Sequence, residues 1–209
     1  ASIERTVLID TSPELRQQMI RHHVMRLDAV LYTHNHADHI FGIDDLRRFN
    51  AVMDQPLDVY AEPRVLQWLT QTFRYIFEPE SNVNKSFIPT LVRKPIEADQ
   101  PFEIADQPWR ALRLMHGRLP VLGFRVGRFA YCTDCSTLPP QTYDALDDLD
   151  VLVIDGLRHR HHPTHMTIAQ ALEVIDQVQP RRAFLTHIAH DIAHRDLEAE
   201  LPANVQPAH

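Results

Sequence analysis

Four apolar segments of this 209-residue chain are each followed by a side chain that can bind a metal ion. The segments read as strands, and the residues that follow them are His34, His116, Asp134 and His187. Because α/β proteins place their sites at the carboxyl ends of strands, along one edge of a sheet, we expect these four residues to converge. Histidines scattered through a hydrophobic core would not be expected to follow strand after strand in this way.

The rest of the chain alternates between short apolar strands and amphipathic helices. Strands are expected at residues 6–10, 27–33, 57–61, 109–115, 121–126, 128–133, 150–154 and 181–186. One helix is expected to begin after Ser12, which would cap it, with Pro13 at its first position. Further helices are expected near 44–47, at 63–73 and at 167–178. Residues 78–108 are rich in proline and lack a clear period, which predicts a loop that is either a lid or part of a subunit contact in a homodimer. One α/β domain over residues 1–209 fits this order.

The composition restricts the partners of the chain. Its net charge is −7 with histidines neutral, which argues against a large nucleic-acid partner but not against a small phosphorylated substrate. No apolar run is long enough to span a bilayer and no signal peptide is visible, so we expect no membrane partner and a cytoplasmic location. Cys132 and Cys135 are expected to be small buried residues at a strand end, because a second Cys-x-x-Cys pair for a metal site is missing.

The densest metal-binding motif is His34-Asn35-His36-Ala37-Asp38-His39, which offers four potential ligands in six residues. Imidazole and carboxylate ligands suit Zn²⁺, Mn²⁺ or Fe²⁺. The first two histidines can face one ion, and Asp38 and His39 can face a second. The alternative is a polar loop that is rich in histidine by chance, which the other strand-end residues disfavour.

This motif resembles the His-x-His-x-Asp-His signature of the metallo-β-lactamase superfamily, whose later His, Asp and His ligands match His116, Asp134 and His187. The resemblance implies an αββα sandwich of two mixed sheets flanked by helices. It also implies two divalent metal ions, Zn or Mn. One ion would be bound by His34, His36 and His116, the other by Asp38, His39 and His187, with Asp134 bridging. A shared water would then become a hydroxide nucleophile at neutral pH, and Asp38 would also orient it.

A second motif narrows the reaction. His165, with Thr167 and Ala171, resembles the His-x-Thr-x-x-x-Ala element of the phosphodiesterase branches. There the histidine contacts the scissile phosphate and donates a proton to the leaving oxygen, which as an alkoxide would leave poorly. The alternative is that His165 only caps the next helix or lies in solvent. Arg158 and Arg160 are expected either to contact phosphate or to form a solvated basic loop.

Within these branches, residues 42–47, 122–125 and 155–158 resemble the phosphoribosyl cyclic phosphodiesterase of phosphonate breakdown. The resemblance implies a phosphodiesterase that acts on a small sugar or nucleotide phosphate, cyclic esters included. Two alternatives stay open: a thioester or lactone hydrolase of the glyoxalase type, and a non-catalytic scaffold stabilised by metal.

The sequence also departs from this family. Family members begin with a strand, a Gly-Thr-Gly-like turn and a Cys-rich loop ahead of the equivalent of Thr6, so we expect those N-terminal strands to be missing from this sequence. In the phosphonate-pathway enzyme, these cysteines and a histidine in the place of His190 hold a structural zinc. An exposed turn histidine explains His190 equally well.

Overall fold

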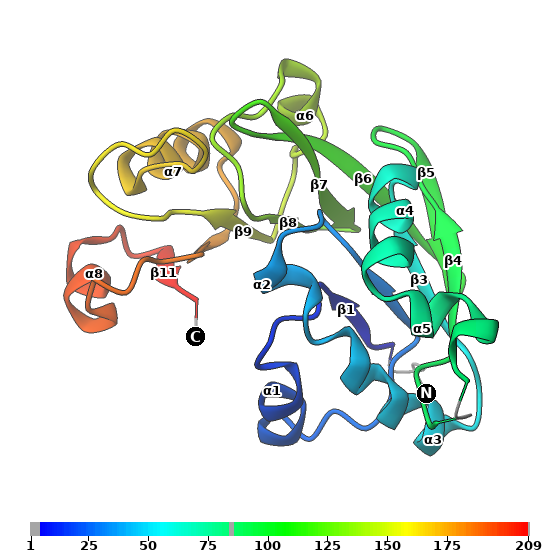
Figure 1. Cartoon of the computed structure of the whole chain (residues 1–209). Helices are drawn as coiled ribbons and strands as arrows, with labels where there is room; N and C mark the ends of the chain where they lie inside the picture. Colours follow the sequence, from blue (N-terminus) through cyan, green and yellow to red (C-terminus); the bar gives the residue numbers. More distant parts are fainter. Residues whose placement is uncertain (1–4, 84–85, 209) are drawn as a thin grey trace. The chain divides into compact units, whose positions relative to one another are not determined.

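The computed structural model describes residues 5–83 and 86–208, which form two compact units, each with its own sheet and core (Figure 1). The first unit contains the residues up to Glu97 together with Ile104–Asp106. The second contains Ala98–Glu103 and the residues from Gln107 onward. No helix of the described segments is long and apolar enough to cross a membrane.

The first sheet has the order β1-β2-β3-β4, and all its strand pairs are parallel. The strands are β1 (Val7–Ile9), β2 (Ala29–Leu31), β3 (Leu57–Ala61) and β4 (Leu91–Pro95). Parallel neighbours need a crossover connection, and helices supply each one. These helices are α1 (Leu15–Arg21), α2 (Ala37–Ile40), η1 (Ile43–Leu46), α3 (Arg47–Met53), α4 (Pro63–Thr72), α5 (Arg74–Phe77) and η2 (Pro79–Ser81).

The first core fills the space between this sheet and its helices. Val30, Tyr32 and Val59 from the strand segments are fully buried, as is Leu69 of α4. Helix α4 packs on β3 and β4 (Figure 1) and begins at Pro63, whose fixed φ suits the first helical position. The apolar β2 strand is therefore held rigidly at the point where the histidine motif begins.

The second sheet is mixed and has the order β11-β10-β9-β8-β7-β6-β5. Strands β6, β7 and β8 pair antiparallel, whereas β8 to β11 pair parallel. The strands are β5 (Pro101–Ile104), β6 (Gln107–His116), β7 (Leu119–Val126), β8 (Phe129–Cys132), β9 (Val151–Asp155), β10 (Arg182–Thr186) and β11 (Val205–Pro207). The helices are α6 (Pro140–Asp144), α7 (Ile168–Val178) and α8 (His194–Glu200). Thr167 and Gln170 form a capping box that starts α7, which packs on β9 and β10.

The expected α/β class with two sheets and flanking helices is confirmed, and each expected strand forms within a few residues of its predicted bounds. The expectation of two mixed sheets was wrong for the first sheet. Its strands are all parallel, because helical crossovers connect them, and only the second sheet is mixed. The helices predicted at 63–73 and 167–178 are also confirmed. The expectation of a single domain stays a prediction.

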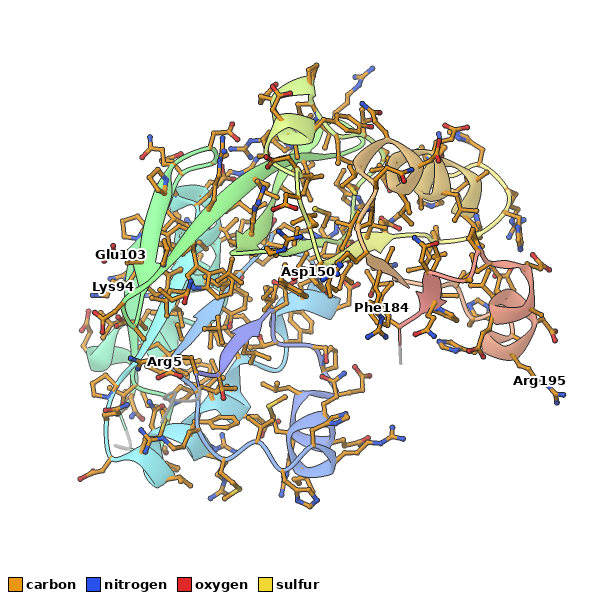
Figure 2. All side chains as sticks on the ribbon, turned by 180° about the vertical axis from the view of Figure 1, so that it is seen from behind. Arg5, Lys94, Glu103, Asp150, Phe184 and Arg195 are labelled. Carbon is orange, nitrogen blue, oxygen red and sulfur yellow. The ribbon has the colours of Figure 1, made fainter. Side chains whose placement is uncertain are left out.

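Two local predictions were wrong. Residues 78–108 are not a single loop, since they include β4, β5 and the start of β6. Strand β4 is an exposed edge strand whose Lys94, labelled in Figure 2, pairs with Asp58 of β3 at 3.5 Å, so it lacks the apolar alternation of a buried strand. Ser12 does not cap α1, because its carbonyl accepts the Leu15 amide in a tight turn and the helix begins at Leu15.

Candidate functional site

The histidine motif begins three residues after the end of β2 and places four candidate ligands close together within the first unit. His34 is buried, and its ring centroid lies 4.5 Å from that of His36 and 4.2 Å from that of His39. Asp38 and His39 lie in the one-turn helix α2, where His39 Nε2 is 3.4 Å from Asp38 Oδ2. The predicted helix at 44–47 is thus preceded by a separate turn that carries two of the ligands.

A buried carboxylate behind this motif fixes the orientation of two of its rings. Asp10 Oδ1 accepts the Thr33 amide at 2.8 Å, while its Oδ2 accepts Thr33 Oγ1 at 2.8 Å and His39 Nδ1 at 2.7 Å. Since the Thr33 hydroxyl donates its one proton to Asp10, its oxygen accepts from His34 Nδ1 at 2.9 Å. Both rings therefore carry their proton on Nδ1 and present Nε2 as the metal-binding atom.

The second unit holds the remaining candidate ligands. His116 ends β6, and its Nδ1 lies 2.8 Å from the Thr164 carbonyl oxygen, so this ring also presents Nε2. His187 follows β10, and its Nε2 lies 3.4 Å from Oδ2 of the buried Asp134. The other Asp134 oxygen accepts from Thr133 Oγ1 at 2.8 Å. His116 is thus the last residue of its strand, Asp134 lies two residues after β8, and His187 directly follows β10.

Three of these residues have a left-handed backbone, which is uncommon outside glycine. The φ angles are 60° at Asp10, 52° at Asp134 and 58° at His187. Each residue comes just after a strand, where the chain must turn sharply to aim its side chain. Backbone strain of this kind concentrates at functional sites, where the surrounding structure maintains it.

The donor set fits a divalent metal ion. Two ligand atoms at about 2.0–2.1 Å from a tetrahedral zinc lie about 3.4 Å apart. That is the separation found between His39 and Asp38 and between His187 and Asp134. Each of the seven predicted ligands belongs to a group of His and Asp side chains that could hold a metal ion: His34, His36, Asp38 and His39 of the first unit, and His116, Asp134 and His187 of the second.

His165 is buried beside two candidate ligands of its own unit. Its ring centroid lies 4.5 Å from that of His116 and 4.6 Å from that of His187. The residue is 8% exposed, and Thr167, not His165, caps α7. The structure therefore places His165 neither in solvent nor in a capping role.

Asp155, the last residue of β9, orients His165. Its Oδ2 lies 2.7 Å from His165 Nδ1 and also accepts the Cys135 amide at 2.8 Å. Its Oδ1 is buried without a hydrogen-bond partner among the described residues. Burial raises the pKa of Asp155, and the His165 hydrogen bond opposes this only in part. With its Nδ1 proton donated to Asp155, His165 has Nε2 left for chemistry.

The basic loop before His165 is largely exposed, and its two arginines contact the loop itself and Asp191. Arg158 donates to the carbonyl oxygens of Arg160 and His161, and Arg160 itself pairs with Asp191 at 3.9 Å. The Arg158 side chain therefore shapes its own loop. The ring of His162 lies 5.0 Å from that of His165, and burial, followed by the charges of His165 and Arg158, lowers its pKa.

Sequence reasoning missed Asp10 and Asp155, although both follow or end a predicted strand. A search for carboxylates at the carboxyl end of every predicted strand, as was done for the histidines, would have found both residues. Cys132 and Cys135 are buried free cysteines, as predicted. His190 is exposed and belongs to none of the candidate metal groups in the described part of the chain.

Comparisons with known proteins identify similar chains. The family described as beta-lactamase superfamily domain matches residues 5–188. The crystal structure of a new diphosphatase from the PhnP family is 31% identical with a TM-score of 0.89, covering 100% of this chain and 79% of that one. The Zn²⁺-bound PqqB structure from Methylobacterium extorquens is 20% identical with a TM-score of 0.74, covering 99% of this chain and 82% of its own, which shows a shared fold.

A curated relative differs from these in length. It is an octanoyltransferase of Porphyromonas gingivalis (strain ATCC BAA-308 / W83), 38% identical over 187 residues. The match covers 89% of this chain but 37% of the relative, so the chain spans little more than a third of that protein.

Proposed function

We propose that this chain, which belongs to the metallo-β-lactamase superfamily and, within it, to the PhnP family, is a metal-dependent hydrolase. More specifically, we propose a dinuclear phosphodiesterase that acts on a small sugar or nucleotide phosphate. The name of the PhnP-family diphosphatase supports a phosphorylated substrate. We also propose that the ester is a phosphodiester, cyclic esters included, and that the metal is Zn or Mn.

The residues that would hold the metal ions are those predicted from the sequence, and Asp134 would be shared between the two ions. When bound, two divalent cations supply Lewis acidity and lower the pKa of water to about 7. Asp10 supports the ligand set by holding His39, and through Thr33 also His34, with Nε2 available. Asp38, whose side chain is 60% exposed, would orient the attacking water and accept its proton.

The observation that carries the proposal is the buried His165–Asp155 pair beside His116 and His187. The Asp155 carboxylate accepts the Nδ1 proton and fixes the ring, so that Nε2 of His165 is the atom that would give a proton to the leaving oxygen. An alkoxide leaves poorly without such a proton, whereas a thiolate leaves well without one. A buried proton donor at this place therefore favours cleavage of a phosphoester over cleavage of a thioester.

The test compares substrates and variants of the metal-loaded protein. We expect hydrolysis of bis(p-nitrophenyl) phosphate and of a cyclic ribose phosphate, with kcat lowered at least about 100-fold in His165→Asn while the metal content is retained. Activity toward thioesters alone, or full phosphodiesterase activity in His165→Asn, would overturn the proposal.

A second candidate is hydrolysis of an acyl thioester, which the octanoyltransferase name of the 38%-identical relative favours. That name describes a protein of which the chain matches 37%, so it carries less weight than the His165 pair. An octanoyl thioester in the same substrate panel separates the two candidates. This second reading requires thioester turnover that does not depend on His165.

A further inference from the structure

An exposed aromatic ring follows directly after the ligand helix α2. Phe41 is 56% exposed, whereas Ile40 and Ile43 on either side of it are fully buried in the first core. The Phe41 amide donates to the Ala37 carbonyl at 3.0 Å, so its backbone is fixed as part of the helical turn. The chain therefore directs two apolar residues inward at this point and leaves a large apolar ring in contact with solvent.

This ring is held in place by a second phenylalanine. Phe41 and Phe73 form an edge-to-face pair with centroids 6.2 Å apart and an interplanar angle of 89°. Phe73 is partly buried against the first core and joins α4 to α5. An edge-to-face contact engages at most one face of Phe41. The other face of Phe41 stays open to solvent. Because the position of the Phe41 ring is already fixed, stacking a ligand ring on that face costs less conformational entropy.

The position of Phe41 at the end of α2 relates it to the candidate metal ligands. Asp38 and Phe41 are three residues apart along this helical turn, so their side chains lie on neighbouring parts of one helix face. The Asp38 side chain is 60% exposed, and the Phe41 side chain is exposed as well. A substrate whose phosphate is held at the metal ligands would then extend its next group toward the Phe41 ring.

From this placement we propose that Phe41 determines substrate specificity by stacking against a planar ring of the substrate, so that the preferred substrate is a nucleotide ester and not a sugar phosphate without a base. The inference rests on the proposed function, since it assumes that phosphate binds at the metal ligands. Aromatic side chains stack on every nucleobase, so Phe41 would select for the presence of a base more than for its identity.

The experiment uses two matched pairs of small molecules with the metal-loaded full chain. Turnover is compared for adenosine 2′,3′-cyclic phosphate and for the same cyclic ribose phosphate without adenine. Binding is compared for AMP and for ribose 5-phosphate by calorimetry. In Phe41→Ala we expect KM for the adenosine ester and Kd for AMP to rise about tenfold, while the values for the two compounds without a base stay within about twofold. Phe41→Tyr keeps the ring and should behave like the wild type.

Phe87→Ala is the matched control, because it removes a phenylalanine that is 55% exposed and lies in the same unit. It should leave all four constants unchanged. An equal effect of Phe41→Ala on compounds with and without adenine, or no preference of the wild type for AMP over ribose 5-phosphate, would overturn the inference. If no phosphoester is hydrolysed, the proposed function fails, and the binding pair still decides the role of Phe41.

Discussion

The Nδ1 atom of His165 lies 2.7 Å from Oδ2 of Asp155, and this contact determines which nitrogen of the buried imidazole is available for proton transfer. The carboxylate fixes the orientation of the ring, while burial raises the pKa of the carboxyl group itself. Burying Asp155 therefore costs stability at a place where it holds the proposed proton donor in position.

Asp155→Asn should separate catalysis from stability. We expect kcat for a phosphodiester to fall at least about 100-fold, because an amide holds the Nδ1–H group of His165 less strongly than a carboxylate does. Adding His165→Asn should lower kcat little further, since the two residues act as a unit. The measurement is steady-state kinetics of the two single variants and the double variant at equal metal content. Independent, multiplicative losses would contradict this account.

The same substitution has a pH-dependent effect on stability. Because the folded pKa of Asp155 lies above its ordinary value, ionisation of this carboxyl costs stability as the pH rises through the folded pKa. The quantity to measure is therefore the free energy of unfolding in urea of the metal-free proteins. The value for Asp155→Asn, relative to that of the wild type, should be higher at pH 7 than at pH 4. A relative stability that moves the other way would show that the carboxylate is stabilised in the fold.

Asp10→Asn should weaken metal binding without removing a proposed ligand. The amide cannot accept all three hydrogen bonds that Asp10 now accepts, so the rings of His34 and His39 lose their fixed tautomers. We expect metal affinity to fall about 10- to 100-fold in a chelator competition assay. Asp58→Asn, which removes a carboxylate that pairs with Lys94 on the surface of the first sheet, is the control and should bind metal normally.

The two cysteines should be unreactive in the folded protein. Burial raises the pKa of Cys132 to about 12 and that of Cys135 well above its usual range. At pH 8, about one Cys132 thiol in ten thousand would be ionised. A thiol reagent should therefore label neither cysteine in native protein and both in denaturant. Rapid labelling of native protein would show that the end of β8 is open to solvent.

Gly42 should not tolerate a side chain. A Cβ atom there would clash with the Ser12 carbonyl oxygen, which is rigid backbone, and would lie 2.9 Å from Leu15 Cβ. Gly42→Ala should lower the free energy of unfolding by about 2 kcal/mol or more. Gly127→Ala is the control. Apart from Gly127 and its two chain neighbours, no heavy atom of the described chain lies within 4 Å of its Cβ position, so only its φ of 53° should cost about 1 kcal/mol.

Sequence reasoning predicted the strand-end residues well because hydrophobic strands and ligand-type side chains are both local signals. It missed β4 because an edge strand with Arg93, Lys94 and Pro95 needs no apolar alternation. It also missed the three-residue strand β11, which is defined by pairing with β10 and has too little pattern of its own. The role of Asp10 depends on hydrogen bonds to residues that lie 23 and 29 positions further along the chain. The role of Asp155 depends on hydrogen bonds to residues that lie 10 and 20 positions away, and no local pattern encodes such contacts.

The central claim is that two divalent ions, bound by the seven predicted ligands, are required for phosphodiesterase activity. The most direct measurement is metal content per chain alongside phosphodiester turnover, for the wild type and for Asp134→Ala. The account predicts about two ions and full turnover in the wild type, with loss of both ions and of turnover in the variant. An Asp134→Ala protein that retains two ions and full activity, or a wild type that is fully active without metal, would contradict it.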